Sequence, residues 1–183
     1  MNKLSDVKFK APIGNKETAA SNSGFKYNEI IGDGNCLYRS IALAQYGNEN
    51  DHLRVRMEIL KYLNDHMRDI GLPHDIRQYI REQQIPNAWG EYYSIVAAAN
   101  LYGRPILIYI PNFTDKRFDI VEGFCTRSDI KGTPFINPDP IKLSYENYAH
   151  YALLTPKPPR GAYAAAVDEG KNTGGGGGGG GPK

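Results

Sequence analysis

Hydrophobic residues recur at helical spacing in the first half of the chain and cluster in short runs in the second half. The spacing predicts helices over residues 36–46, from Asp51 towards residue 70, from Asp75, and from residue 92 to about 102. Glycines follow three of the four helices and provide their stops. The apolar faces expected to be buried are Leu37, Ile41 and Ala44; Leu53, Met57, Leu60 and Met67; Ile76, Tyr79 and Ile80; and Tyr92, Ile95, Val96 and Ala99.

The clearest strand is residues 105–111, a β-branched and aromatic run bounded by prolines, which we expect near the middle of a sheet. Further strands are expected over residues 28–31, 118–122, 141–145 and 151–155. Helices precede most strands, so the predicted fold class is α+β, with a small central, mixed or mostly antiparallel β-sheet flanked by helices.

Both ends of the chain differ in composition from the middle. Residues 1–24 are polar and typical of a loosely ordered arm. After Lys157, prolines and alanines lead into eight consecutive glycines, which are typical of a flexible tail or linker. We therefore expect a catalytic domain over residues 25–157, between an arm at 1–24 and a tail at 158–183.

Composition narrows the functional classes. The 22 basic and 20 acidic residues give a net charge of +2, and the basic residues are scattered, which does not indicate a nucleic-acid partner. The two cysteines are far apart, so neither a zinc cage nor a disulfide framework is expected, and no metal or other cofactor. No apolar stretch reaches the ~18 residues of a membrane helix. A cytoplasmic monomer is the resulting expectation.

Cys36 follows the tight turn formed by residues 32–35 and opens a predicted helix, where the positive helix end favours a thiolate. His150 stands just ahead of a predicted strand, and an imidazole there could take the thiol proton and protonate an amine leaving group. Backbone N–H groups of the turn could form an oxyanion hole. Taken alone, however, a single cysteine is more often structural, and that is our interpretation of Cys125.

Two other interpretations of the turn are weaker. Gly32 and Gly34 resemble the start of a dinucleotide-binding fingerprint, but Leu37 occupies the third glycine position. Asp33 and Gly34 could form a hairpin turn, but helical rather than alternating periodicity follows them. A strand, a turn and a helix carrying Cys36 remain the preferred sequence of elements.

Three blocks, within residues 30–154, together resemble the ovarian tumour (OTU) domain cysteine proteases, which remove ubiquitin from other proteins. The blocks are Gly32-Asp33-Gly34-Asn35-Cys36-Leu37-Tyr38-Arg39-Ser40-Ile41-Ala42, then Trp89-Gly90-Glu91-Tyr92 with the helix and strand that follow, and His150-Tyr151-Ala152-Leu153-Leu154. The resemblance implies a papain-like architecture and hydrolysis of isopeptide bonds after the C-terminal Gly-Gly of ubiquitin.

The resemblance also implies residue roles. Cys36 would be the nucleophile that forms a thioester, and His150 its general base and acid. Asp33 would shape the oxyanion turn or support the triad. Trp89 and Gly90 would be packing and turn residues, with Gly90 near the substrate channel.

One position departs from the family pattern. An Asp or Asn often follows the catalytic histidine by two residues and orients its ring, but this chain has Ala152 there. Either another residue orients His150 or the enzyme works as a dyad. The candidates are Asn28, Glu29, Asp33 and Asn147.

Two further functions stay open. The domain could be a catalytically weak or inactive ubiquitin-binding module, which Ala152 favours, or a hydrolase of another ubiquitin-like modifier. The expected partners are ubiquitin, polyubiquitin chains and ubiquitinated proteins. A compact domain of this kind suits a viral or bacterial effector acting in the host cytosol, and equally a part of a longer eukaryotic protein.

Overall fold

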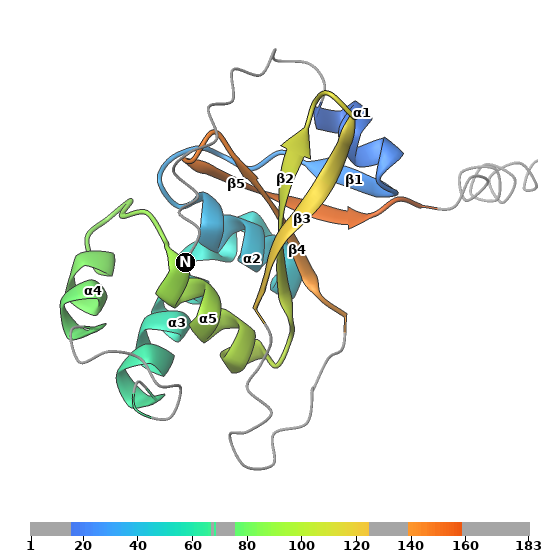
Figure 1. Cartoon of the computed structure of the whole chain (residues 1–183). Coiled ribbons are helices and arrows are strands. Elements are labelled where there is room, and N and C mark those ends of the chain that lie inside the picture. The colour runs from blue at the N-terminus through green and yellow to red at the C-terminus, as the bar shows by residue number, and fades with distance from the viewer. Residues whose placement is uncertain (1–15, 67, 69–75, 125–138, 159–183) are drawn as a thin grey trace, which may run out of the picture.

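The computed structural model describes residues 16–66, 68, 76–124 and 139–158. Its helices are α1 (Lys16–Asn22), α2 (Cys36–Tyr46), α3 (His52–His66), α4 (Ile76–Gln83) and α5 (Tyr92–Tyr102), with a short 3-10 helix η2 (Glu49–Asp51) before α3. Its strands are β1 (Phe25–Asn28), β2 (Ile106–Asn112), β3 (Arg117–Phe124), β4 (Ile141–Glu146) and β5 (His150–Pro156), as Figure 1 shows. The predicted α+β class is confirmed.

The strands form one mixed sheet in the order β1-β5-β4-β2-β3. β2 and β4 are parallel, and every other neighbouring pair is antiparallel. β2 has a neighbour on each side, as expected for the run at 105–111. The expected strand at 28–31 lies slightly earlier, at Phe25–Asn28.

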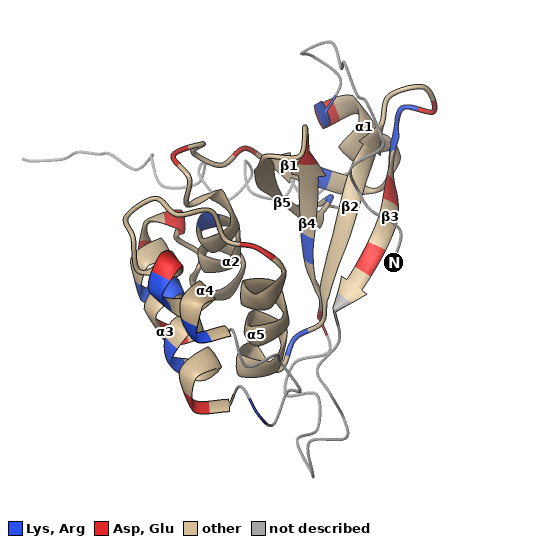
Figure 2. Ribbon diagram, turned by 60° about the vertical axis from the view of Figure 1, so that its left-hand side comes forward, with Lys and Arg blue, Asp and Glu red and all other residues tan. Residues whose placement is uncertain are grey.

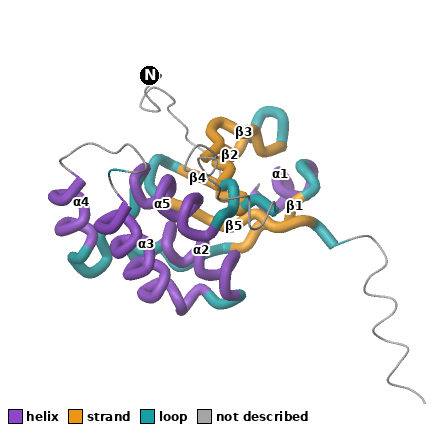
Figure 3. The backbone as a smooth tube through the Cα atoms, turned by 90° about the horizontal axis from the view of Figure 1, so that it is seen from below, coloured by secondary structure: helices purple, strands orange, loops and turns teal. Residues whose placement is uncertain are grey.

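Both faces of the sheet are covered. Helices α2 to α5 gather on one side, and α1 lies beside β1 and β3, apart from them (Figures 1 and 3). β5 shows why both faces are apolar: Leu153 belongs to the core cluster shared with the helices, whereas Ala152 and Leu154 belong to the cluster that includes α1. β5 therefore packs against both layers of the fold, and its first residue is His150.

Residues 16–22 correct the expectation of a loosely ordered arm. They form α1, in which Ala19 and Ala20 are fully buried. The helix is tied down by polar contacts: Lys16 pairs with the buried Glu146, and the Ser23 hydroxyl just after α1 accepts a hydrogen bond from the Phe118 N–H at 2.7 Å. Residues 1–15, Cys125 and residues 159–183 lie outside the described part of the chain.

The predicted buried face of α3 is wrong for its first turns. Leu53 and Met57 are about three-fifths exposed, at 62% and 61%. The helix has a second apolar stripe, offset by two residues from Leu53 and Met57, and that stripe enters the core together with a charged residue. The buried residues are Val55, Arg56, Ile59, Leu60 and Leu63.

α5 differs from its prediction in a similar way. Tyr92 is 54% exposed, whereas Ser94 is fully buried. The Ser94 hydroxyl is hydrogen-bonded to the Tyr38 hydroxyl at 2.8 Å and to the Tyr79 hydroxyl at 2.7 Å. Two tyrosines thus satisfy a polar group at a core position, which makes its burial tolerable.

Charged residues of both signs are interspersed along α3 and β3 (Figure 2). Among the helices that the structure describes, none is long and apolar enough to cross a bilayer.

Candidate active site

Cys36 is the first residue of α2, directly after the predicted turn. Gly34 in that turn has φ of +86°, a conformation that glycine adopts without strain. A Cβ atom on Gly34 would also lie 2.2 Å from the Asn87 carbonyl oxygen. The turn is therefore pressed against the segment around Asn87, and only glycine fits at position 34.

Asp33 stabilises the same turn. One of its carboxylate oxygens accepts a hydrogen bond from the Asn35 N–H at 3.0 Å, and the other accepts one from Arg39 Nη2 on α2 at 2.7 Å. Hydrogen bonding to Arg39 is the main reason that the pKa of Asp33 lies well below its usual range. The structure thus places the Asp33 carboxylate on Arg39 and the turn.

The start of β5 lies against the Cys36 thiol. The Tyr151 N–H donates to Cys36 Sγ at 3.4 Å, and Sγ lies 3.9 Å from the Ala149 carbonyl oxygen. These two groups flank His150. A hairpin loop with Asn147 and Tyr148 at positive φ connects β4 to this point. The structure therefore brings together the two segments that carry Cys36 and His150.

Burial dominates the electrostatics of Cys36, which is only 7% exposed, and raises the pKa of its thiol. The N–H groups of Tyr151, Leu37 and Cys36 itself act in the opposite direction, because they stabilise a thiolate. The helix-end effect predicted from the sequence is present, but burial outweighs it. A proton acceptor beside Sγ is therefore needed for attack.

Glu29 is the orienting candidate that the structure places beside His150. Its Oε1 atom lies 3.9 Å from His150 Nε2, a buried nitrogen to which the described residues offer no hydrogen-bond partner. Gly32 lies close to the ring, since a Cβ atom on Gly32 would be 3.7 Å from Nδ1. The Glu29 side chain is 67% exposed, so its carboxylate approaches the imidazole from the solvent side.

The other candidates are directed elsewhere. The Asn28 amide nitrogen donates to the Leu153 carbonyl and to Thr155 Oγ1, both at 3.0 Å, and so ties β1 to β5. Asp33 is held by Arg39. Asn147 is exposed in the hairpin loop.

A cavity of about 400 Å³ opens beside Cys36. Its walls combine aromatic side chains, aliphatic side chains and two carboxylates. The lining residues are Cys36, Trp89, Gly90, Glu91, Tyr92, Ile95, Ile108, Val121, Glu122, Tyr145, Tyr148, Ala149 and Tyr151.

Trp89 and Gly90 have different places in this wall. Trp89 is 57% exposed, so it is not the packing residue that the sequence predicted. Gly90 does pack tightly: a Cβ atom there would lie 2.6 Å from Leu37 Cδ2 and 3.0 Å from the Tyr38 ring. Gly90 also lines the cavity, as expected.

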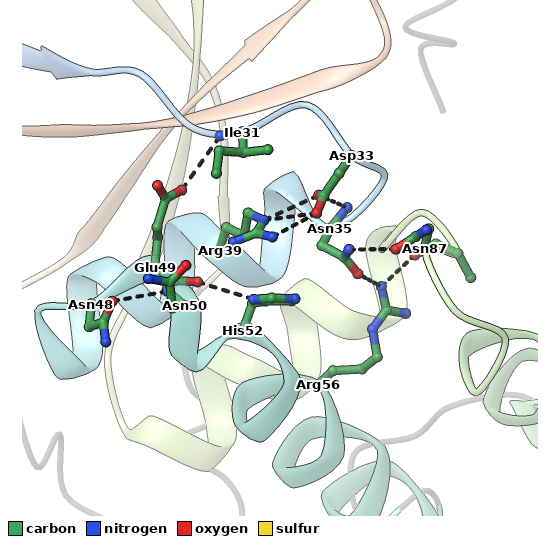
Figure 4. A network of polar contacts seen from close by, with 11 residues as sticks. Ile31, Asp33, Asn35, Arg39, Asn48, Glu49, Asn50, His52, Arg56 and Asn87 are labelled. Atoms are coloured by element: carbon green, nitrogen blue, oxygen red, sulfur yellow. Dashed lines mark hydrogen bonds and ion pairs between the residues drawn. The ribbon is translucent and has the colours of Figure 1, made fainter.

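Sequence reasoning missed a polar network beneath the turn (Figure 4). Asn35 precedes α2 but does not cap it through its side chain. Its carbonyl oxygen Oδ1 instead accepts a hydrogen bond from Arg56 Nη2 at 2.7 Å, and its Nδ2 donates to Asn87 Oδ1 at 2.8 Å. No sequence signal distinguishes Arg56 from the exposed Arg54 of the same helix.

A cysteine at the start of a helix, with a histidine segment against it from a neighbouring strand, defines the papain-like class of cysteine protease. The chain belongs to the OTU-like cysteine protease family, whose profile matches residues 31–152. It is 28% identical over 134 residues to the OVARIAN TUMOR DOMAIN-containing deubiquitinating enzyme 6 of Arabidopsis thaliana, covering 72% of this chain and 24% of that protein. It is 27% identical over 130 residues to human OTU domain-containing protein 5, covering 70% and 22%. The chain thus spans about a quarter of these relatives.

Solved structures share the fold. The OTUD1 OTU domain superposes with a TM-score of 0.60 at 22% identity, covering 77% of this chain and 91% of that chain. The viral OTU domain protease of Farallon virus gives a TM-score of 0.58 at 20% identity, covering 76% and 88%. The Hazara virus OTU, solved bound to ubiquitin, gives 0.53 at 18% identity, covering 76% and 85%.

Proposed function

We propose that this protein is a thiol-dependent deubiquitinase that hydrolyses isopeptide bonds after the C-terminal Gly-Gly of ubiquitin. The observation that carries the proposal is the position of Cys36 Sγ, which contacts the backbone on both sides of His150 at the wall of a 400 Å³ cavity. A deubiquitinating relative and a ubiquitin-bound structural neighbour support ubiquitin as the modifier.

The chemistry follows from these groups. His150 accepts the Cys36 proton while Sγ attacks the carbonyl carbon of the terminal glycine, and the oxygen becomes an oxyanion. Backbone N–H groups at the start of α2 and in the turn stabilise that charge. The C–N bond then breaks, and His150 returns its proton to the departing lysine amine. A water molecule that gives a proton to His150 attacks the thioester, which releases the ubiquitin carboxylate and restores the thiol.

Glu29 is the residue that we assign to orienting His150. A carboxylate near Nε2 favours the ring orientation that leaves Nδ1 for proton exchange, and it stabilises the imidazolium formed during attack. At 3.9 Å and on the solvent side, this support is weaker than that of a buried aspartate.

The cavity also limits the substrate. Gly90 forms part of its wall, and the aromatic side chains of Trp89 and Tyr148 line it together with Tyr151. Such a wall accommodates an extended tail whose last residues lack side chains, because the backbone must approach Sγ closely.

A panel of diubiquitins and a ubiquitin probe with a thiol-reactive C-terminus test the proposal. We expect the wild-type protein and Cys125→Ala to cleave diubiquitin and to take up the probe, and Cys36→Ala to do neither. Equal cleavage by Cys36→Ala would show that another residue is the nucleophile. A wild-type protein that binds ubiquitin but is not labelled would be a binding module, and cleavage of another modifier alone would overturn the choice of substrate.

A further inference from the structure

Arg56 is a buried cation beneath the active-site turn. It lies on α3, is 5% exposed, and its guanidinium carbon is 4.0 Å from the centre of the Tyr38 ring. Its hydrogen bonds run to neutral oxygens. They are those of Nη2 to Asn35 Oδ1 and to the Ala88 carbonyl, both at 2.7 Å, and those of Nη1 to the Gln83 carbonyl at 3.0 Å and to Gln83 Oε1 at 3.2 Å.

Burying a charge against neutral acceptors is costly, and aliphatic side chains would fill the same space without that cost. Desolvation accordingly lowers the pKa of Arg56. The position of its acceptors indicates what the arginine does in return. A single nitrogen, Nη2, binds two segments that are far apart in sequence, at Asn35 and at Ala88.

Each of the two segments bound by Nη2 lies next to residues that line the cavity. Asn35 is 2% exposed and directly precedes Cys36, and Ala88 directly precedes Trp89 and Gly90. Gln83 completes the link, because its Nε2 donates to the Trp89 carbonyl at 2.7 Å. Figure 4 shows the guanidinium of Arg56 between Asn35 and the chain at Asn87.

We propose that Arg56 is a positioning residue that holds the oxyanion turn and the Trp89–Gly90 wall of the cavity in fixed register. It does not line the cavity next to Cys36 and touches no reacting atom. Its effect arises because N–H donors stabilise an oxyanion only when they are aligned with it beforehand. This inference rests on the proposed hydrolase function for its kinetic part only.

The planar guanidinium presents its donors in a fixed fork, which a lysine ammonium cannot reproduce. Arg56→Lys keeps the charge and loses the fork, and Arg56→Gln loses both. Arg54→Gln is the matched control, since Arg54 lies on the same helix with a side chain that is 58% exposed. Asn35→Ala removes the acceptor from the other side of the contact.

Kinetics with a ubiquitin substrate, normalised to titrated active sites, separate positioning from loss of folded protein. We expect Arg56→Lys and Arg56→Gln to lower kcat by about 10–100-fold, approaching the loss of one oxyanion donor, with KM changed by less than about threefold. Alkylation of Cys36 by iodoacetamide needs no oxyanion hole and should stay within about threefold of the wild-type rate. The double variant Asn35→Ala with Arg56→Gln should lower kcat by a smaller factor than the product of the factors for the two single variants, because both substitutions break the same contact.

A second measurement does not depend on activity. Trp89 is the only tryptophan of the chain, so acrylamide quenching of its fluorescence reports on the cavity wall. Hydrogen exchange of peptides covering residues 33–36 and 88–91 reports on both tethered segments. Both Arg56 variants should raise quenching and exchange there, whereas Arg54→Gln should match the wild type.

Wild-type kcat per active site in both Arg56 variants, with unchanged Trp89 quenching, would overturn the inference and leave Arg56 a core residue. If the wild-type protein hydrolyses no ubiquitin substrate, the proposed function fails, and the exchange and quenching data alone decide the role of Arg56. If Arg56→Gln does not fold, Arg56→Lys and Asn35→Ala provide the same comparison.

Discussion

At the scale of single residues, Glu29 differs from the buried carboxylate of a typical triad because it is exposed and 3.9 Å from the imidazole. Glu29→Gln should therefore lower kcat by roughly tenfold, far less than the ~10⁴-fold loss seen when a buried triad aspartate is neutralised. The difference in kcat between Glu29→Gln and the wild type should become smaller as the salt concentration is raised, since ions screen the exposed carboxylate of the wild type. Steady-state kinetics between about 0.05 and 0.5 M salt would measure both effects.

Asn28→Ala is the matched control for Glu29→Gln. Asn28 is the neighbouring residue, but its amide holds β5 rather than His150. The Asn28→Ala variant should lower the free energy of unfolding by about 1 kcal/mol, the usual contribution of a hydrogen bond, and leave the salt dependence of kcat unchanged. A loss of kcat in Asn28→Ala alone would reassign the orienting role.

Asp33 makes stability depend on pH. Because Arg39 lowers the pKa of Asp33 in the folded state, the carboxylate stabilises the fold above its unfolded pKa of about 3.9, and this contribution is lost as the pH falls below that value. Asp33→Asn keeps an oxygen acceptor without the charge, so its unfolding midpoint in urea should fall less steeply between about pH 4 and pH 2. Equal slopes in wild type and Asp33→Asn would contradict the assignment.

At the scale of elements, two glycines at the ends of α2 allow backbone strain and steric contact to be separated. Gly34 and Gly47 both have positive φ, but a Cβ atom on Gly47 meets nothing within 4 Å, whereas one on Gly34 meets the Asn87 carbonyl. Gly47→Ala should therefore cost about 1–2 kcal/mol of unfolding free energy and leave probe labelling intact. Gly34→Ala should cost more and slow labelling at least tenfold, because the turn or the Asn87 segment must move.

Urea denaturation and the rate of labelling by the ubiquitin probe measure these two quantities. If Gly34→Ala and Gly47→Ala had equal free energies of unfolding and equal labelling rates, the contact between the turn and Asn87 would be unimportant.

Helices whose boundaries are marked by neighbouring residues can be predicted from the sequence, whereas helices whose buried face depends on contacts with other elements cannot. α2 was predicted to its terminal residues because the turn before it and Gly47 after it are local signals. α3 carries two apolar stripes, and only the contacts of Arg56 and Val55 with other elements decide which one is buried. α1 has no clear sequence signal, because its buried side chains, Ala19 and Ala20, are small and its partners include the distant strands β2 and β3 as well as the adjacent β1.

At the scale of the whole molecule, some site residues can be predicted from local motifs, and others depend on how distant segments come together. Cys36 and His150 stand in recognisable motifs, so their convergence could be predicted from the sequence. Glu29 could only be named among several candidates, since its relation to His150 depends on the path of the chain between β1 and α2. Nothing in the sequence marks Arg56 as part of the site, because a buried arginine on a helix has no local signature.

The charge of the cavity also belongs to the molecule as a whole, since Glu91 precedes α5 and Glu122 lies on β3. Two carboxylates at one cavity favour a substrate tail that carries basic side chains. Charge reversal in Glu91→Lys and Glu122→Lys together should raise KM several-fold at low salt with little change in kcat, and added salt should reduce the difference. Glu17→Lys and Glu82→Lys together, on the exposed faces of α1 and α4, make an equal change of charge away from the cavity and should leave KM unchanged. A KM increase of the same size in this control would show that net charge, rather than the two cavity carboxylates, controls binding of the tail.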